Sequence, residues 1–134
     1  MSCSQLTSVD FPNATYIGDS AFNNCNSLTS IDLPNVTSMG DWVFEGCNSL
    51  TSIDLPENIT SIGSYAFNSC SNLSTVIIST NQIITLGDKW VFYNTPIENG
   101  SGYIYVPDSL VSSYRSASNW STYSAQNKSV NELA

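Results

Sequence analysis

Apolar residues return at fixed intervals along most of the chain. A short unit, in which a Cys precedes a Leu by three residues, begins at Cys3 and recurs at positions 25, 47 and 70. In the third unit Leu50, Ile53 and Leu55 alternate with polar residues, which predicts a short strand with its apolar side chains facing inward. The other units have apolar residues at nearly the same offsets. The pattern therefore predicts a stack of similar coils, each burying its apolar face against its neighbours.

The rest of each coil is also patterned. Pro56 follows the strand directly and should end it, because Pro lacks the N–H that a strand ladder needs. Gly63 follows an Ile, and the other units repeat this Gly, which predicts a positive φ or a close backbone approach. Ala66 and Phe67 then predict one turn of helix whose Phe fills the core between coils. Stacking should place equivalent Leu, Phe and Cys side chains in ladders along one parallel sheet.

The C-terminal part departs from the repeat. Residues 103–106 match the strand pattern and predict a fifth strand. Asp108 or Ser109 is expected to cap a helix that runs over about residues 110–117. The sequence thus predicts that the array ends in a strand and a helix.

Two bulky aromatic residues, Trp120 and Tyr123, follow this helix and are expected to fold back on the open edge of the sheet. They would belong to a cap that hides the last strand edge and the end of the core. We therefore expect repeats in residues 1–100, and a final strand with a C-terminal cap in residues 101–134. The first unit begins at Cys3 with no N-terminal cap before it, which favours a C-terminal fragment of a longer chain.

The repeat consensus, Cys-x-x-Leu-x-x-Ile-x-Leu-Pro followed by Ile-Gly and Ala-Phe, resembles the BspA-like (treponemal-type) leucine-rich repeats from Cys3 to about Phe92. A period of roughly 20–29 residues is typical of leucine-rich repeats in general. The expected fold is an α/β repeat solenoid: a right-handed leucine-rich-repeat array with a short parallel sheet, short helical or 3-10 turns and a C-terminal helical cap. The segment from Tyr103 to Tyr123 is similar to the one that closes such arrays in proteins of gut-dwelling Firmicutes.

The resemblance implies a cell-surface or secreted location and a part in adhesion to host components or other microbes. On this basis we expect a non-catalytic interaction module that binds a protein or glycan ligand through the concave sheet face. The alternative is a structural spacer or cap of a larger surface protein, with no binding of its own. The first residues of the chain lack the basic segment and apolar stretch of a signal peptide, so the location rests on the resemblance.

Charge and composition exclude several classes. Three basic residues against eleven acidic ones give a net charge of −8, which excludes nucleic-acid binding and disfavours an anionic membrane surface. No apolar run approaches the roughly 20 residues that span a bilayer. The chain has no His, and no motif for a catalytic site, a cofactor or a metal was found. We therefore expect no enzyme activity and no cofactor.

One offset of the predicted strand carries a carboxylate in three successive coils, at Asp10, Asp32 and Asp54. Like charges on neighbouring strands repel one another, so such a column invites a cation, and Ca²⁺ prefers oxygen ligands. A weak Ca²⁺ site is one interpretation. A solvated, salt-screened row is the simpler one.

The acidic column is expected to meet aromatic residues on the final strand. Tyr supplies a large contact area in protein interfaces, so this stripe is a candidate binding surface. The candidate ligand-binding residues are Ser30, Asp32, Ser52, Asp54, Tyr103 and Tyr105.

The four Cys are predicted to be free, buried thiols packed as small apolar groups, because no CxxC pair or zinc-site spacing occurs. Tyr16, Trp42, Tyr65 and Trp90 precede the repeated Phe on the return side of the coils. They are either contact anchors or shields of the convex surface.

Overall fold

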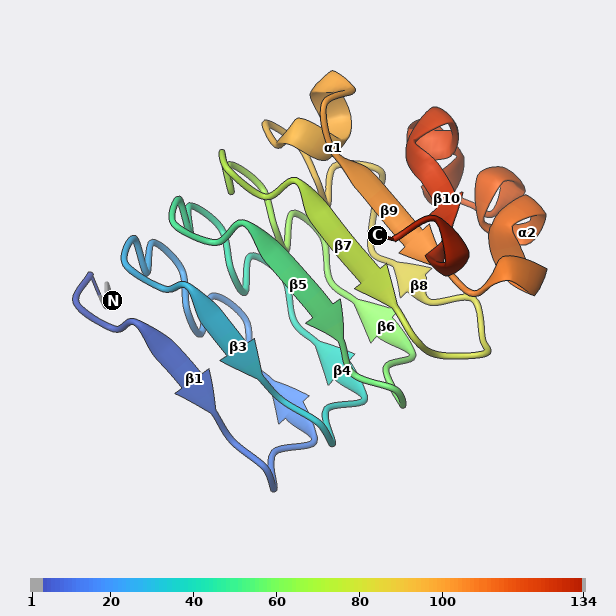
Figure 1. Cartoon of the computed structure of the whole chain (residues 1–134). Helices are drawn as coiled ribbons and strands as arrows, with labels where there is room; N and C mark the ends of the chain where they lie inside the picture. The colour runs from blue at the N-terminus through green and yellow to red at the C-terminus, as the bar shows by residue number, and fades with distance from the viewer. Residues whose placement is uncertain (1–3, 134) are drawn as a thin grey trace.

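The computed structural model describes residues 4–133, which form a stack of coils closed at its C-terminal end by short helices (Figure 1). One strand of each coil lies on the same side of the stack, and these strands run parallel where they pair. The α/β repeat solenoid is therefore confirmed, and so is the strand predicted over residues 103–106. The strands on this side are β1 (Ser8–Asp10), β3 (Ser30–Asp32), β5 (Ser52–Leu55), β7 (Thr75–Ile78) and β9 (Tyr103–Val106).

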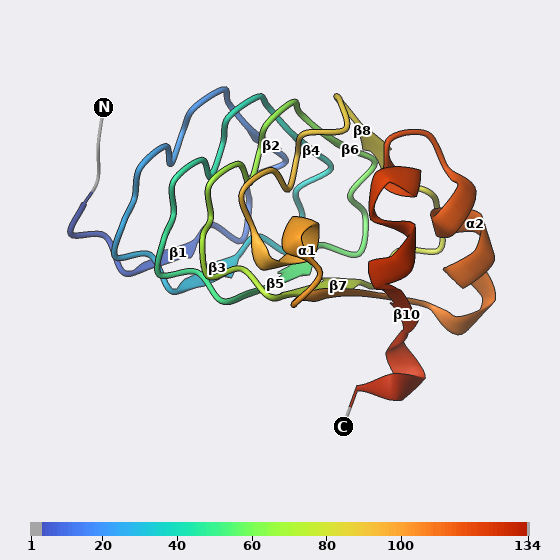
Figure 2. The same cartoon turned by 90° about the horizontal axis from the view of Figure 1, so that it is seen from above.

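A second parallel sheet lies on another side of the coils and was not predicted (Figure 2). It joins four strands in the order β2-β4-β6-β8. Each has only two residues, which is too short for an alternating pattern to stand out in the sequence. The strands are β2 (Tyr16–Ile17), β4 (Ser38–Met39), β6 (Ser61–Ile62) and β8 (Thr85–Leu86).

A ladder of stacked Phe rings runs through the core, as predicted. The ring centroids of Phe22, Phe44, Phe67 and Phe92 are 5.5, 5.4 and 5.7 Å apart along the stack. The last three of these side chains are completely buried. The segment around each Phe forms hydrogen-bonded turns, such as Cys47 N–H to the carbonyl of Phe44, rather than the predicted turn of helix.

The repeated Gly marks close contact between coils. A Cβ on Gly63 would lie 2.3 Å from the carbonyl carbon of Gly40, so no side chain fits there. Gly63 does not have a positive φ; the left-handed turns occur at other positions, such as the residues before Cys25, Cys47 and Cys70. At three of these positions the φ angles are 60°, 74° and 62°, for Asn24, Gly46 and Ser69.

Two of the Cys are buried free thiols, as expected, and they also donate hydrogen bonds. The Cys47 and Cys70 thiols donate to the carbonyls of Phe22 and Phe44, over 3.3 and 3.0 Å. Each of these Phe residues lies three positions before the previous Cys of the repeat. The neighbouring Cys47 sulfur, together with burial, raises the pKa of the Cys70 thiol.

The free-thiol prediction is wrong for Cys25, which is held in a disulfide. Neighbouring coils lie about 4.8 Å apart, within the Cα separation that a disulfide bridges, so parallel stacking does not prevent a bond. Cys3 lies outside the described residues.

The C-terminal segment contains the predicted helix. α2 (Val111–Ser116) lies within the expected range, but a 3-10 turn precedes it, and neither Asp108 nor Ser109 caps it through a side chain. No helix within residues 4–133 is long and apolar enough to cross a membrane. The other elements here are α1 (Pro96–Asn99), η1 (Asp108–Leu110), η2 (Trp120–Gln126), β10 (Asn127–Ser129) and η3 (Val130–Glu132).

Trp120 and Tyr123 close the end of the core at the last coil, as expected of the cap, whereas the edge of the sheet is covered by another element. Trp120 and Tyr123 pack on Phe92, with ring centroids 6.0 and 5.4 Å away. The indole N–H of Trp120 donates to the carbonyl of Ile84 over 2.7 Å, and the Tyr123 hydroxyl donates to the carbonyl of Lys89. The edge of β9 is covered by β10 instead, in parallel pairing.

Candidate ligand-binding face

The outward side chains of β1, β3, β5, β7 and β9 form one surface, called here the sheet face. Strand alternation produces it: in β5, Ser52 and Asp54 are exposed, whereas Ile53 between them is buried. All six predicted binding residues lie on this face, which is the concave face of the sequence interpretation. Its outward residues are Ser8, Asp10, Ser30, Asp32, Ser52, Asp54, Thr75, Ile77, Tyr103 and Tyr105.

The sheet beneath this face is interrupted, which the repeat pattern did not predict. Among the described residues β3 pairs only with β1, and β5 pairs only with β7. On the return side the same two coils stay joined, because β4 pairs with β6. The strands therefore separate on the sheet face alone.

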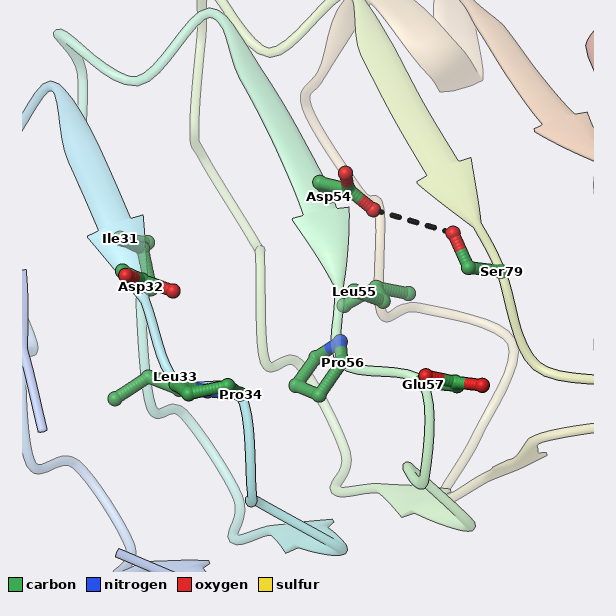
Figure 3. A pocket seen from close by; sticks show the side chains of 9 residues that line it. All are labelled: Ile31, Asp32, Leu33, Pro34, Asp54, Leu55, Pro56, Glu57 and Ser79. Atoms are coloured by element: carbon green, nitrogen blue, oxygen red, sulfur yellow. Dashed lines mark hydrogen bonds between the residues drawn. The ribbon is translucent and has the colours of Figure 1, made fainter. Parts of the chain in front are cut away.

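An open cleft of about 340 Å³ lies at the interruption, called here the strand cleft (Figure 3). Asp32 of β3 and Asp54 of β5 both line it, and the Asp54 side chain is turned away from Asp32, toward Ser79 of the next coil. The Asp54 carboxylate accepts a hydrogen bond of 3.4 Å from the Ser79 hydroxyl. The lining residues are Ile31, Asp32, Leu33, Pro34, Asp54, Leu55, Pro56, Glu57 and Ser79.

The strand cleft combines two features that suit a polypeptide ligand. Ile31 is only partly buried, whereas Val9 and Ile53 at the same offset in the adjacent coils are buried, so apolar surface is accessible at the cleft. The edges of β3 and β5 that face each other do not pair with a strand of the described chain. Unpaired strand edges can bind an extended peptide through main-chain hydrogen bonds.

The three carboxylates of the acidic column do not come together in the part of the chain that the structure describes. Asp10 and Asp32 are in register on paired strands, but the interruption separates Asp32 from Asp54. Over residues 4–133 no group of three or more Asp, Glu, Cys or His side chains comes together in a way that could hold a metal ion. The arrangement of Asp10, Asp32 and Asp54 therefore gives no support to a Ca²⁺ site.

The other end of the sheet face is aromatic and carries one cation. The Tyr103 and Tyr105 ring centroids are 6.3 Å apart, at an interplanar angle of 54°. The ammonium of Lys128 lies 4.2 Å from the centroid of the Tyr103 ring, in cation–π contact. The register places Asp54 beside Ile77 and Ile77 beside Tyr105, so the acidic column leads into the tyrosines as predicted.

Sequence reasoning missed Lys128. It lies on β10, paired opposite Tyr105, and β10 was not predicted. The segment Asn127-Lys128-Ser129 has no apolar residue, so alternation gives no signal there. Asn127 is nevertheless completely buried, and its carbonyl accepts a hydrogen bond from Arg115 over 2.7 Å. This tertiary contact helps to hold the strand in place.

Two solved structures resemble this chain over most of its length. One is a leucine-rich repeat protein from Bacteroides ovatus ATCC 8483, with 30% identity, a TM-score of 0.66, and coverage of 84% of this chain and 28% of that one. The other is a leucine rich cell surface protein from Faecalibacterium prausnitzii A2-165, with 32% identity, a TM-score of 0.63, and coverage of 89% and 29%. This chain thus spans under a third of either protein.

No curated protein matches the chain. The family model for the BspA type leucine rich repeat region, with six copies, matches residues 1–121. That match covers the whole repeat array and much of the cap, and it agrees with the consensus in the sequence and the stacked coils of the structure. The chain belongs to the BspA-type leucine-rich-repeat family.

Proposed function

We propose that this chain is a non-catalytic interaction module of a bacterial cell-surface protein, and that it binds a protein ligand through the sheet face. The observation that carries the proposal is the strand cleft. It offers unpaired edges of β3 and β5, two strands that each carry an exposed Asp, and such edges suit an extended polypeptide segment.

The charges on the sheet face indicate what the ligand segment should contain. Asp10, Asp32 and Asp54 make the N-terminal side acidic, so Lys or Arg side chains of a ligand would be attracted there. Tyr103 and Tyr105 offer a broad apolar contact with hydroxyl groups at the other end. The expected ligand is therefore a protein segment with basic residues near one end and apolar residues near the other.

The comparisons support a surface location. The Faecalibacterium prausnitzii protein is described as a cell surface protein, and this chain is 32% identical to it over 89% of its own length. Since the chain covers 29% of that protein, the surface location and the binding activity of this chain are part of the proposal.

A structural spacer or terminal cap is the second candidate function. It is favoured by the way Trp120, Tyr123 and Asn119 cover the last coil and donate to its carbonyl groups. A segment that ends a solenoid could be retained for that purpose alone. In that case the sheet face would bind no ligand.

A binding screen separates the two candidates. The chain is tested against immobilised extracellular-matrix proteins, mucins and microbial cells, beside a variant carrying Asp32→Ala, Asp54→Ala and Tyr105→Ala. Tyr16→Ala is the matched control, because this side chain is 58% exposed but lies on β2 of the return sheet. The proposal requires a protein ligand that binds the wild-type chain and the control but not the triple variant. Absence of binding to any of these surfaces would favour the spacer.

A further inference from the structure

A second surface, away from the sheet face, carries four aromatic residues from three successive coils: Trp42, Tyr65, and the pair Trp90 and Tyr93. It is called here the aromatic corner. Trp42 and Tyr65 occupy equivalent positions, two residues before a buried Phe, and their rings are parallel within 1° at a centroid distance of 4.3 Å. Trp90 and Tyr93 are 36% and 39% exposed. Tyr16, grouped with these aromatics in the sequence, lies outside the corner on β2.

The backbone conformation at Trp42 and Tyr65 does not require large side chains. Trp42 and Tyr65 have φ angles of 61° and 57°, in the left-handed region, which disfavours bulky residues. The first coil adopts the same conformation with a small residue, Ser20, at a φ of 58°. The turn can therefore form without an aromatic ring, and the two rings cover surface that the fold leaves open.

A column of polar side chains runs beside the aromatic column. The amide of Asn23 donates to one oxygen of the Glu45 carboxylate over 3.0 Å, and the amide of Asn68 donates to the other over 2.8 Å. Glu45 and Asn68 lie in the same turns as Trp42 and Tyr65, since their N–H groups donate to those residues' carbonyls. Planar amide and carboxylate groups are thus held in the same turns as the aromatic residues.

The repeat breaks at the fourth coil, where an aromatic replaces the polar residue. The N–H of Tyr93 donates to the carbonyl of Trp90 over 3.0 Å, as that of Asn68 does to Tyr65. The Trp90 and Tyr93 rings meet edge to face, at 83° and 5.4 Å between centroids. Together with Tyr65 they line a hollow of about 290 Å³. This volume is at the small end of the range for ligand sites, which suits a single sugar ring.

We propose that the aromatic corner binds a neutral carbohydrate. One face of a pyranose ring presents C–H groups, which pack against the electron-rich face of an aromatic ring. The hydroxyl groups at the rim of the sugar can exchange hydrogen bonds with amides and carboxylates such as those of Asn68 and Glu45. Trp42 stacks on Tyr65, so the facing sides of these two rings cover one another, and the sugar is expected to bind in the hollow lined by Tyr65, Trp90 and Tyr93.

Charge selects the neutral class of sugar. The chain has a net charge of −8, and Glu45 and Asp88 belong to the turns of the corner, so anionic glycans are repelled. Lys89 is a nearby cation, with its ammonium 4.8 Å from the centroid of the Trp90 ring, and it opposes the two carboxylates only in part. This inference concerns a surface separate from the sheet face and does not depend on the function proposed for it.

Titration calorimetry with neutral hexasaccharides of glucose, mannose, xylose and N-acetylglucosamine tests the proposal, with a heparin hexasaccharide as the anionic comparison. The variants are Trp90→Ala and Tyr65→Asn, the second chosen because Asn tolerates a left-handed φ. Tyr105→Ala, on the sheet face, is the control. Thermal melting of each variant verifies that it is folded.

The proposal expects at least one neutral hexasaccharide to bind, with affinity reduced about tenfold in Tyr65→Asn and in Trp90→Ala and unchanged in Tyr105→Ala. It is overturned if no neutral sugar binds, or if the sugar binds the folded corner variants as well as the wild type. Loss of protein-ligand binding in these variants, without any sugar binding, would assign the corner to a protein instead. The sheet-face function fails separately, if Tyr105→Ala binds the protein ligand as well as the wild type does.

Discussion

At the scale of single residues, the stability of the stack depends on what one coil places against the next. The N–H of Gly63 donates to the carbonyl of Met39 over 2.9 Å, and its Cα lies against the backbone of Gly40. The Phe rings fill the space between coils on the inside. Backbone contact and ring contact are thus separate sources of stability that separate substitutions can test.

Gly63→Ala should destabilise the chain. The added Cβ would meet backbone atoms of Gly40 and Asp41 at 2.3–2.5 Å, and backbone cannot move aside as a flexible side chain can. Overpacking of this kind costs about 1–3 kcal/mol of unfolding free energy, measurable by urea denaturation. Gly18→Ala is the matched control, because its Cβ would be 3.9 Å from the nearest atom, on the Tyr16 ring. Equal stability of the two variants would contradict the close contact.

Phe67→Ala should cost more. This ring is completely buried and stacks on a Phe in each neighbouring coil, so its removal leaves a cavity with lost contacts on both sides. The expected loss is about 3–5 kcal/mol in the same denaturation experiment. Phe11→Ala serves for comparison, because Phe11 is 47% exposed. A similar small loss for both would show that the Phe ladder is not a main source of stability.

At the scale of elements, strong local patterns were predictable and elements made by tertiary contact were not. The alternation Tyr-Ile-Tyr-Val identifies β9, and the spacing of Leu110, Val111 and Tyr114 identifies the helix. The strands of the return sheet and β10 are too short or too polar to show a period. The interruption between β3 and β5 has no sequence signal either, because Ser-Ile-Asp stands in both strands.

The missing pairing between β3 and β5 should be detectable by amide hydrogen exchange. Amides of β3 and β5 that face the strand cleft should exchange faster with deuterium than those of β7, which pairs on both sides. Exchange followed by NMR resolves the individual amides. Uniform protection across β3, β5 and β7 would mean that the sheet is continuous in solution.

We expect the protein to lose stability at alkaline pH because of buried Tyr side chains in the cap. Burial raises the pKa of Tyr123 to about 12 and also raises that of Tyr114. The unfolded chain, with a Tyr pKa near 10, then releases its proton first as pH rises. The stabilising contribution of Tyr123 is therefore complete below about pH 10 and lost between about pH 10 and pH 12.

Thermal melting across this pH range measures the effect. Tyr123→Phe removes the titrating hydroxyl, so its Tm should fall less steeply above about pH 10 than that of the wild type. Tyr105→Phe is a control on the sheet face, outside the cap. Parallel slopes for the wild type and Tyr123→Phe would show that the buried hydroxyl does not govern the alkaline transition.

At the scale of the whole molecule, the repeat produces the solenoid, and the proposed site forms where the pairing between β3 and β5 is interrupted. All six predicted binding residues share one face because strand alternation dictates which side chains point outward. The strand cleft and the cation Lys128 were not predictable, since both depend on how coils pack rather than on a pattern within one coil. The family and the fold therefore follow from the sequence, whereas the geometry of the proposed site required the structure.

The most direct test of the central claim is amide exchange of the chain with and without the protein ligand that the binding screen identifies. If an extended segment pairs with the strand edges of the cleft, amides of residues 30–32 and 52–55 that face it should become protected in the complex. Those of β4 and β6, in the same coils but on the return sheet, should be unchanged. Protection confined to the return sheet, or no protection in β3 and β5 at saturating ligand, would contradict the account.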